Sequence, residues 1–528
     1  MSNGAIAMKW RQTGAWTPAG WLAVLGLLVG PAGCGRQTAP APSVADQFRG
    51  IKLVVGVVGD PALLRSVAGQ RGEWVAKTGS ELVLRDGPID LKAVGDEIDV
   101  LVFPGDRMGD LVDTKALAVL PELVVAPPPE PDPSADAGLT DPAAPPSRPV
   151  DPFKFVDVAP AFRNLVSKYG PDRYGLPIGG SALVVAFQRA AFVKPEFVEA
   201  AKAAGLTLEP PQTWEQFDAL ARFFHGRDLD GDGQPDYGVA LPWGTDPAGV
   251  GDAVFLARTA ASALHPDQYS FLLDSETTTP RVASPPFVES LQALLTLQAV
   301  GPPQAATMDA TAARAAFKSG RVALLLDRAE TASTWGTGQA PIGVAPLPGS
   351  PRVFDPSRSA WETPSILNRP SYLPSGGGWL VGVTAKTKQK GAAEAFARFL
   401  AEPESTNRLR AERDFPMLAV RTSQLTQGMT NPRSAPGVEA RSWADAVTRT
   451  LSAEKVVLGL RIPGATSYHA DLSTARVAAV NGQSPAEALQ TLTDAWAKRT
   501  QSLQLPRQTW HHRRSLIGPT TAPEPPAR

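Results

Sequence analysis

One stretch of the sequence, residues 174–224, constrains the fold more than any other. It opens with a turn rich in glycine and proline, and a short apolar run, residues 182–187, follows Ser181. The length of this run and its β-branched residues predict a strand buried on both faces. Farther on, Thr213 and Gln216 form a capping box that starts a helix with one apolar face. A buried strand followed by an amphipathic helix indicates an α/β crossover.

The N-terminal part predicts a parallel sheet. Residues 51–58 and 99–104 are apolar runs of strand length, and the segment between them has a helical pattern. Strand, helix and strand in this order form a βαβ unit. Ligands of parallel sheets bind beyond the C-terminal ends of the strands. In this chain those ends carry Asp60 and the pair Asp106–Arg107.

Length and composition exclude several classes of protein. At 528 residues the chain is too long for one hydrophobic core, so two or more domains are expected. Its 51 basic and 52 acidic side chains give a formal net charge of -1, which indicates no nucleic-acid partner. A single cysteine excludes an intramolecular disulfide and a cysteine-rich metal site.

The N-terminus has the pattern of a secretory signal peptide. Lys9 and Arg11 precede an apolar run, residues 21–30, and small residues lead to Cys34. The run is too short to span a membrane. Ala32-Gly33-Cys34 resembles a bacterial lipoprotein box, which implies lipidation of Cys34 and an extracytoplasmic protein, periplasmic or at the cell surface, that is anchored to the membrane. The alternative is a secreted protein that keeps an idle thiol.

The stretch 174–224 resembles the extracellular solute-binding proteins of sugar ABC transporters. Segments around Asp106–Arg107, at residues 316–327 and at residues 481–489 resemble the same family in the family's order. The most specific match is residues 376–400, where three glycines and Trp379 begin a strand that precedes an amphipathic helix. The resemblance implies an α/β fold of the two-lobe periplasmic-binding-protein type (type II), in which each lobe is a central β-sheet flanked by helices and the ligand cleft lies between the lobes.

The resemblance also implies how the chain is divided, with crossings between the lobes near residues 181–187 and 342–346. The expected parts are a signal peptide (1–33), a lipidated tether (34–49), an N-terminal lobe (50–181 and 347–420, with a proline-rich disordered insert at 126–150), a C-terminal lobe (182–346 and 421–505) and a disordered tail (506–528).

Several polar and aromatic residues are expected to hold the solute. The Asp106–Arg107 pair matches a pair that contacts sugar hydroxyls in the family, and a carboxylate beside a guanidinium suits vicinal diols. Aromatic rings suit the C–H faces of sugars. The expected ligand-binding residues are Asp60, Asp106, Arg107, Ser181, Trp243, Trp335, Trp379, Tyr468 and His469. Each tryptophan could equally belong to the core, and Asp106–Arg107 could be a salt bridge in a surface turn.

An acidic loop, residues 228–236, predicts a structural calcium ion. Carboxylates at its first, third, fifth and ninth positions, with glycine at the sixth, match the first three quarters of an EF-hand loop. The twelfth position is Val239 instead of glutamate, so a complete EF-hand is excluded. The alternative is a solvated acidic turn. The expected ligands are Asp228, Asp230, Asp232, Gln234 and Asp236.

These expectations combine into one function. The resemblance implies a monomeric lipoprotein that captures a mono- or oligosaccharide between two closing lobes and delivers it to an ABC permease. One alternative is a module that binds a non-sugar solute or serves a scaffold or sensor. The other is a glycoside hydrolase, which needs two carboxylates roughly 5 to 10 Å apart. Asp60, Asp106 and Asp327 are candidates, but the sequence has no GxSxG motif and we expect no enzymatic activity.

Overall fold

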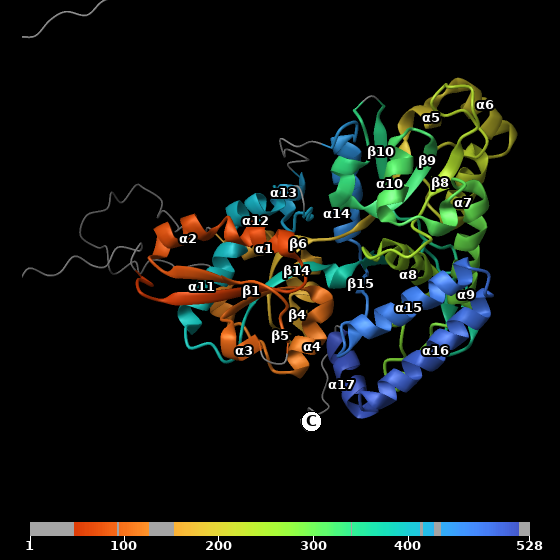
Figure 1. The fold of residues 1–528 in the computed structure, drawn as a ribbon. Coiled ribbons are helices and arrows are strands. Elements are labelled where there is room, and N and C mark those ends of the chain that lie inside the picture. The colour runs from red at the N-terminus through yellow and green to blue at the C-terminus, as the bar shows by residue number, and fades with distance from the viewer. Residues whose placement is uncertain are drawn as a thin grey trace, which may run out of the picture. The chain divides into compact units, whose positions relative to one another are not determined.

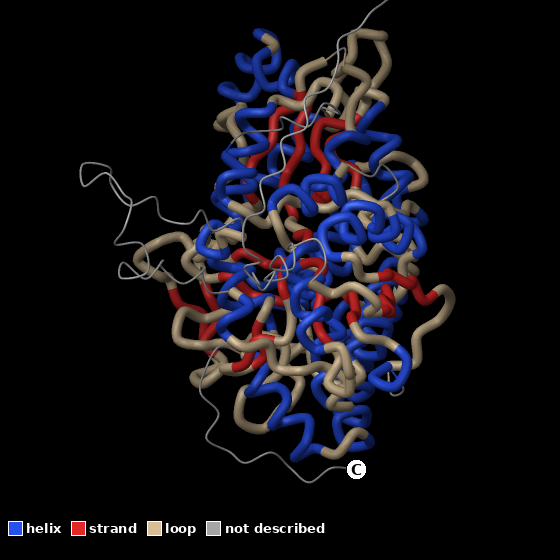
Figure 2. Tube along the Cα trace, turned by 90° about the vertical axis from the view of Figure 1, so that its left-hand side faces the viewer, coloured by secondary structure: helices blue, strands red, loops and turns tan. Residues whose placement is uncertain are grey.

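Two β-sheets organise the described part of the chain, and each sheet with its helices is called a lobe here (Figures 1 and 2). The structure, a computed structural model, describes residues 47–91, 94–125, 153–338, 340–411, 415–426 and 435–516. Sheets with helices packed on them agree with the predicted α/β class. The signal peptide, Cys34 and the proline-rich insert at residues 126–150 lie outside the described residues.

Lobe 1 contains a five-stranded mixed sheet. Its order is β2 (Glu81–Arg85), β1 (Lys52–Val57), β3 (Val100–Pro104), β14 (Gly378–Val383) and β6 (Leu176–Gly180). Strand β1 is parallel to both β2 and β3, as the βαβ pattern predicts, whereas β14 is antiparallel to β3 and β6. The ends of β1, β3 and β6 and the start of β14 therefore share one edge of the sheet.

Lobe 2 contains a four-stranded sheet in the order β10 (Ile342–Pro346), β7 (Leu183–Gln188), β9 (Val322–Arg328) and β8 (Tyr237–Ala240). Every residue of β7 is buried, which confirms the predicted strand. Val184 and Ala186 join one core cluster, whereas Leu183, Val185 and Phe187 join the other. Because side chains alternate along a strand, a strand covered on both faces is apolar at almost every position, and the one polar residue of β7, Gln188 at its end, donates to the Phe317 carbonyl.

Helices cover the sheets of both lobes, and local signals set where several begin. Asp60 caps α1 (Pro61–Ala68), Asp309 caps α10 (Ala310–Lys318), and Thr213 and Gln216 form the predicted capping box of α7 (Trp214–Phe224). No helix in the described ranges combines the length and the hydropathy of a membrane-spanning segment. The α-helices of lobe 1 are α1 (Pro61–Ala68), α2 (Arg71–Thr78), α3 (Val94–Glu97), α4 (Met108–Asp113), α11 (Lys390–Leu400) and α12 (Pro403–Arg410).

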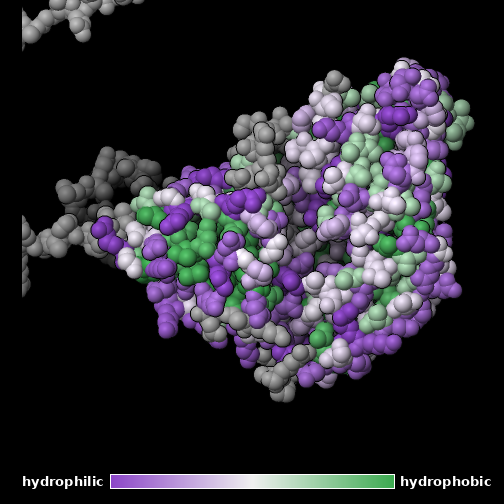
Figure 3. Space-filling model, in the orientation of Figure 1, coloured by the Kyte–Doolittle hydropathy of each residue, from purple (hydrophilic) through white to green (hydrophobic). Residues whose placement is uncertain are grey.

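The remaining helices follow or flank the sheet of lobe 2. The outer side of α16 is mainly hydrophilic (Figure 3), while its Leu489, Leu492 and Trp496 are buried, as expected for an amphipathic helix. These helices are α5 (Arg189–Val193), α6 (Pro195–Ala203), α7 (Trp214–Phe224), α8 (Val250–Ala263), α9 (Pro285–Thr296), α10 (Ala310–Lys318), α13 (Thr422–Thr426), α14 (Ala440–Leu451), α15 (Ala465–Val480), α16 (Pro485–Ser502) and α17 (Leu505–Ser515).

The chain returns to lobe 1 later than predicted. We expected residues 342–346 to cross and residues from 347 onward to belong to the N-terminal lobe. Instead β10 pairs with β7 along its whole length. The hairpin of β11 (Val353–Asp355) and β12 (Ala360–Glu362) follows, and β11 and β13 (Ser371–Leu373) pack against α8. The return falls between β13, which pairs with β15 (Val456–Leu458), and β14.

The C-terminal segment is a helix where we expected a disordered tail from residue 506. Helix α17 has five buried residues: Arg507, Gln508, Trp510, His511 and His512. Its charged side chains are paired with residues far away in the sequence. Arg507 and His511 bind Asp113 at the end of α4, and Arg513 binds Glu276 in a loop of lobe 2. These partners make burial of a polar segment favourable.

Candidate functional site

A glycine turn, residues 375–378, lies where the two lobes meet. Gly376, Gly377 and Gly378 all have positive φ angles. A Cβ atom at Gly376 would overlap the backbone of Gly105 and Asp106, so only glycine lets β14 begin so close to the end of β3. The Ser181 backbone N–H donates to the Gly377 carbonyl at 3.1 Å. The turn thus joins the end of β3 to the crossing between lobes.

Asp106 and Arg107 lie beside this turn but have different surroundings. Both residues are half-buried in the 3-10 turn that follows β3. Arg107 donates from Nη1 to Asp110 Oδ2 at 3.3 Å and also binds Thr466 Oγ1 at the start of α15. Within the described ranges, the Asp106 carboxylate takes part in no hydrogen bond or ion pair. Arg107 is therefore a structural link, whereas Asp106 is a carboxylate available to a ligand.

Lobe 2 contributes two charged residues that the sequence analysis did not include in the site. Arg328, the last residue of β9, donates from Nη2 to Ser375 Oγ at 3.3 Å and to the Ala248 carbonyl at 2.6 Å. Its Nε atom is buried without a hydrogen-bond partner. Glu330 binds the Ser181 hydroxyl, and burial raises the pKa of the Glu330 carboxyl. Arg328 ends β9 and Glu330 follows it, where the two lobes meet. This position at the end of a strand was the signal by which the sequence could have identified both residues.

Asp60 and Ser181 have local partners. Asp60 caps α1, with its Oδ1 accepting from the backbone of Ala62 at 2.7 Å and of Leu63 at 3.2 Å. Ser181 is buried, and its hydroxyl donates to Glu330. Both residues lie at the predicted strand ends, so the sequence placed them correctly in the fold. Their polar atoms already have protein partners.

Three of the predicted aromatic residues belong to the core. Trp243 donates from Nε1 to the Leu294 carbonyl at 3.0 Å, and the Tyr468 hydroxyl lies 2.9 Å from Thr500 Oγ1. Trp335 is fully buried and donates to Asp327 Oδ2 at 2.8 Å. In this arrangement these rings present no face to a solute. Sequence alone could not separate the two roles, because a buried ring and a stacking ring need the same side chain.

Trp379 and His469 are half-buried and remain candidates. Trp379 lies at the start of β14, next to the glycine turn, and packs edge-to-face on Phe415 with ring centroids 5.1 Å apart. His469 lies in the first turns of α15, near Gly459. The structure thus brings Asp106, Arg328 and Trp379 to the glycine turn. The polar atoms of Asp60, Arg107, Ser181 and the three buried aromatic residues instead form hydrogen bonds within the protein.

Asp327, a candidate acid for a hydrolase, is fully engaged. Arg314 donates to its two oxygens at 2.6 and 2.9 Å. Thr331 and Trp335 also donate to Oδ2. With four hydrogen bonds, two of them from a guanidinium, both oxygens of this carboxylate are engaged by the protein. Its role here is structural.

The acidic loop brings three of the five expected calcium ligands together. Asp228, Asp230 and Asp236 each offer a carboxylate oxygen, and these atoms lie within 4.8 Å of one another. Hydrogen bonds from the Gly233 backbone, followed by those of other loop amides, lower the pKa of Asp228. Asp236 also pairs with Arg321 at 2.7 Å. Three converging carboxylates fit a hard cation, although Arg321 already supplies positive charge to Asp236.

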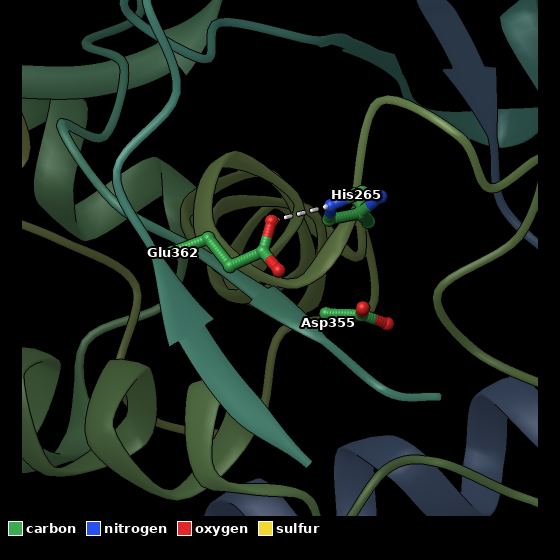
Figure 4. Close-up of side chains that lie close together, drawn as sticks. All are labelled: His265, Asp355 and Glu362. Carbon is green, nitrogen blue, oxygen red and sulfur yellow. Dashed lines mark hydrogen bonds and ion pairs between the residues drawn. The ribbon is translucent and has the colours of Figure 1, made fainter. Parts of the chain in front are cut away.

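A second group of possible metal ligands lies on lobe 2 (Figure 4). His265 follows α8, and Asp355 and Glu362 end the two strands of the β11–β12 hairpin. The His265 Nε2 atom lies 3.3 Å from Glu362 Oε2, and the Asp267 N–H donates to Nδ1. Arg358 donates to Glu362 Oε1 at 2.8 Å. Arg358 already supplies the positive charge that a metal ion would bring, so we assign this group no metal.

Comparison with known proteins identifies the family. The sequence profile of the bacterial extracellular solute-binding proteins matches residues 73–407, more than half of the chain. The chain belongs to this family. Solute binding outside the cytoplasm therefore follows from family membership, and the predicted resemblance is confirmed. No curated protein matches the chain.

Solved structures confirm the two-lobe fold. A solute-binding protein from Agrobacterium radiobacter K84, in complex with ribitol, is 18% identical with a TM-score of 0.57, covering 86% of this chain and 100% of its own. A cyclo/maltodextrin-binding protein complexed with maltotetraose is 17% identical, with a TM-score of 0.55 and coverage of 86% and 98%. Maltose-bound MalE3 of T. maritima is 15% identical, with a TM-score of 0.54 and coverage of 85% and 100%.

Proposed function

We propose that this protein captures a carbohydrate, a mono- or oligosaccharide, at the glycine turn and delivers it to an ABC permease. The observation that carries the proposal is the pair of unsatisfied polar groups at this turn. Asp106 from lobe 1 is without a hydrogen-bond partner in the described ranges, and Arg328 from lobe 2 has a buried Nε in the same situation. A carboxylate and a guanidinium that face one solute from two lobes suit vicinal hydroxyl groups.

The similar structures support this choice of solute. Two of them hold maltose or maltotetraose and one holds ribitol, and all three compounds carry several hydroxyl groups. The half-buried Trp379 beside the turn adds an aromatic ring, and a sugar packs its C–H face on the face of such a ring. We further propose that Cys34 is lipidated, that the protein works as a monomer at the outer side of the membrane, and that it catalyses no reaction.

The test is a melting-temperature screen of the mature protein against saccharides, polyols, amino acids and peptides. A ligand at 100 times its Kd stabilises the folded state by about 2.7 kcal/mol, which is easily measured. We expect a saccharide or polyol to raise the melting temperature, and we expect that compound to be chemically unchanged after incubation with the protein. A ligand that is consumed would support a glycoside hydrolase, and a response restricted to amino acids or peptides would contradict the proposed solute.

The site itself is tested with Asp106→Ala against the matched control Asp494→Ala, which removes an exposed carboxylate on α16. We expect Asp106→Ala to weaken binding of the identified solute about tenfold or more, with little change in melting temperature, because a charge-assisted hydrogen bond is lost. The control should bind normally. Equal affinities of the two variants would remove Asp106 from the site.

We also propose that the acidic loop binds a structural calcium ion through Asp228, Asp230 and Asp236. If it does, a chelator should lower the melting temperature and added Ca2+ should restore it, since a bound ion stabilises the folded state. Asp230→Asn should abolish this response, whereas Asp267→Asn, an exposed carboxylate in another loop, should retain it. A wild-type melting curve that is insensitive to chelator would leave only a solvated acidic turn.

A further inference from the structure

None of the residues expected to hold the solute lines a cavity of about 660 Å³ in the described part of the chain. Its walls are the loop at 266–272, the loop at 364–370, the segment 454–461 that contains β15, and the end of α17. Most of its lining side chains are apolar, Leu272, Val457 and Leu516 among them. Pockets of roughly 300 to 1,000 Å³ with such walls are typical sites for small molecules.

Three cations line this cavity without a carboxylate partner. Arg369, Lys455 and Arg461 form no ion pair with any residue in the described ranges. Glu454 is the one acidic residue on the wall, and it is exposed to solvent. Burial lowers the pKa of all three cations, that of Arg461 to about 10. Each cation is thus partly removed from water without an ion pair, although the charges of Asp267 and Glu454 favour the charged form of Lys455.

Backbone carbonyls hold these cations in place. Lys455 Nζ donates to the carbonyls of His265 and Pro266 at 2.9 and 2.7 Å. Arg461, which is 2% exposed, donates to the Val166 carbonyl at 3.2 Å and to the Ser515 carbonyl at 3.1 Å. Carbonyl dipoles orient a cation but do not cancel its full charge. The field inside the cavity therefore favours an anion.

His512 adds a buried polar group on the wall formed by α17. It is 2% exposed, and both ring nitrogens are shielded from solvent. Burial lowers its pKa to about 4, and the Leu273 backbone, which favours the protonated ring, only partly opposes this shift. The ring is therefore neutral at pH 7 and adds no charge to the wall.

We infer that this cavity binds a small organic carboxylate with an apolar body. The cations fix the sign of the charge, and the apolar walls accept an aromatic or aliphatic chain. A simple inorganic anion would leave those walls in contact with water. The lining of this site differs from that of the solute site at the glycine turn, and the inference does not depend on the nature of that solute.

Isothermal titration of the mature protein tests the inference with octanoate, benzoate and 4-phenylbutyrate, and with 4-phenylbutanamide as the uncharged analogue. At least one carboxylate should bind with a Kd below about 1 mM. The amide should bind about tenfold more weakly than its acid, because it lacks the charge that the cations attract. No carboxylate binding in this range, or equal binding of acid and amide, would overturn the inference.

Ile366 offers a variant that does not disturb the core, since it lines the cavity and is 70% exposed. Ile366→Glu places a negative charge at the wall and should weaken carboxylate binding about tenfold, whereas Ile366→Gln, of the same size, should bind almost normally. Equal weakening by both would mean that charge does not govern the site. Neither variant should change the melting-temperature response to the solute of the glycine turn.

Removal of a cation gives the complementary test. Lys455→Gln should weaken carboxylate binding several-fold and leave the amide unaffected, while Lys388→Gln, which removes an exposed charge elsewhere, should leave both unaffected. The melting temperatures of the two variants show whether each is folded. A folded Lys455→Gln protein that binds the carboxylate as tightly as Lys388→Gln would contradict the role of the lysine.

Discussion

The glycine turn and helix α17 both connect distant parts of the chain, but they do so by different means. At the glycine turn, backbone meets backbone: a Cβ at Gly376 would overlap Gly105 and Asp106. At α17, long charged side chains make the connection, with Arg507 and His511 both on Asp113. The first contact depends on the absence of side chains and the second on their charges.

This difference determines how each contact fails. A contact of two backbones has no flexible atom that can move aside, so an added methyl group must displace a strand or a turn. A network of ion pairs can lose one partner and keep the others, with a cost set by how much charge is left buried. The glycine turn should therefore be the more sensitive region to a single substitution.

Gly376→Ala is expected to have the largest effect. The new Cβ would overlap the backbone at the end of β3, and the residue would keep a φ of 64° that alanine rarely adopts. We expect a loss of about 4 kcal/mol or more in the free energy of unfolding, measured by urea denaturation. Gly391→Ala in α11 is the control, because nothing lies within 4 Å of the added methyl group there. If both variants were equally stable, the turn would have rearranged to accommodate the added methyl group.

The sequence carried enough information to predict this region. Three consecutive glycines before a buried strand indicate a close approach, because no other residue type permits one at little cost. The apolar run at residues 182–187 predicted β7 in the same way, since a strand buried on both faces has little room for polar residues. Family resemblance then placed both segments in a two-lobe fold.

Helix α17 could not be predicted from the same kind of reasoning. Its sequence contains three arginines and two histidines in eleven residues, the composition of a solvated tail. It is buried because Asp113, Asp172 and Glu276 pair with it. These partners lie more than 200 residues away, and a local pattern does not reveal them. The roles of Trp243 and Trp335 were undecided for a similar reason: their surroundings come from other elements.

Asp113→Asn should have the next largest effect. Burial alone would raise the pKa of Asp113, but hydrogen bonds from His511 and Arg507 outweigh it and lower the pKa. Loss of the charge removes the carboxylate that balances the buried guanidinium of Arg507, at a cost of about 3 kcal/mol. Asp445→Asn, in an exposed pair with Arg449, should cost about 0.5 kcal/mol or less.

The lowered pKa of Asp113 also makes its contribution to the stability of the folded state depend on pH. Because the folded-state pKa of Asp113 is lowered, its stabilisation is present above the unfolded pKa of about 4 and is lost as the pH falls through the folded value. Chemical denaturation at pH 7 and at pH 3 should show that the difference between Asp113→Asn and wild type shrinks in acid. A difference that is the same at both pH values would mean that packing, and not charge, holds α17 at this end.

The smallest expected effect concerns His512, the neighbour of His511 on α17, and it occurs at milder pH. Burial lowers the pKa of His512 from 6.5 to about 4, so the unfolded chain binds a proton that the folded chain does not. Stability from this group is complete above pH 6.5 and decreases as the pH falls towards 4. At pH 5 the loss is about 2 kcal/mol. Urea denaturation between pH 7 and 5 measures it.

His512→Gln removes the titration while keeping a polar side chain of similar size, so its stability should change less between pH 7 and 5 than that of wild type. His225→Gln, at the exposed end of α7, is the control and should retain the wild-type slope. If His512→Gln also retained that slope, acid would act on another group. If it lost the slope, while the difference in stability between wild type and Asp113→Asn still shrank below pH 4, the Asp113 and His512 contacts of α17 would be shown to weaken at different pH values. A side-chain connection can be released in such steps, whereas the glycine turn has no titrating group in its backbone contact.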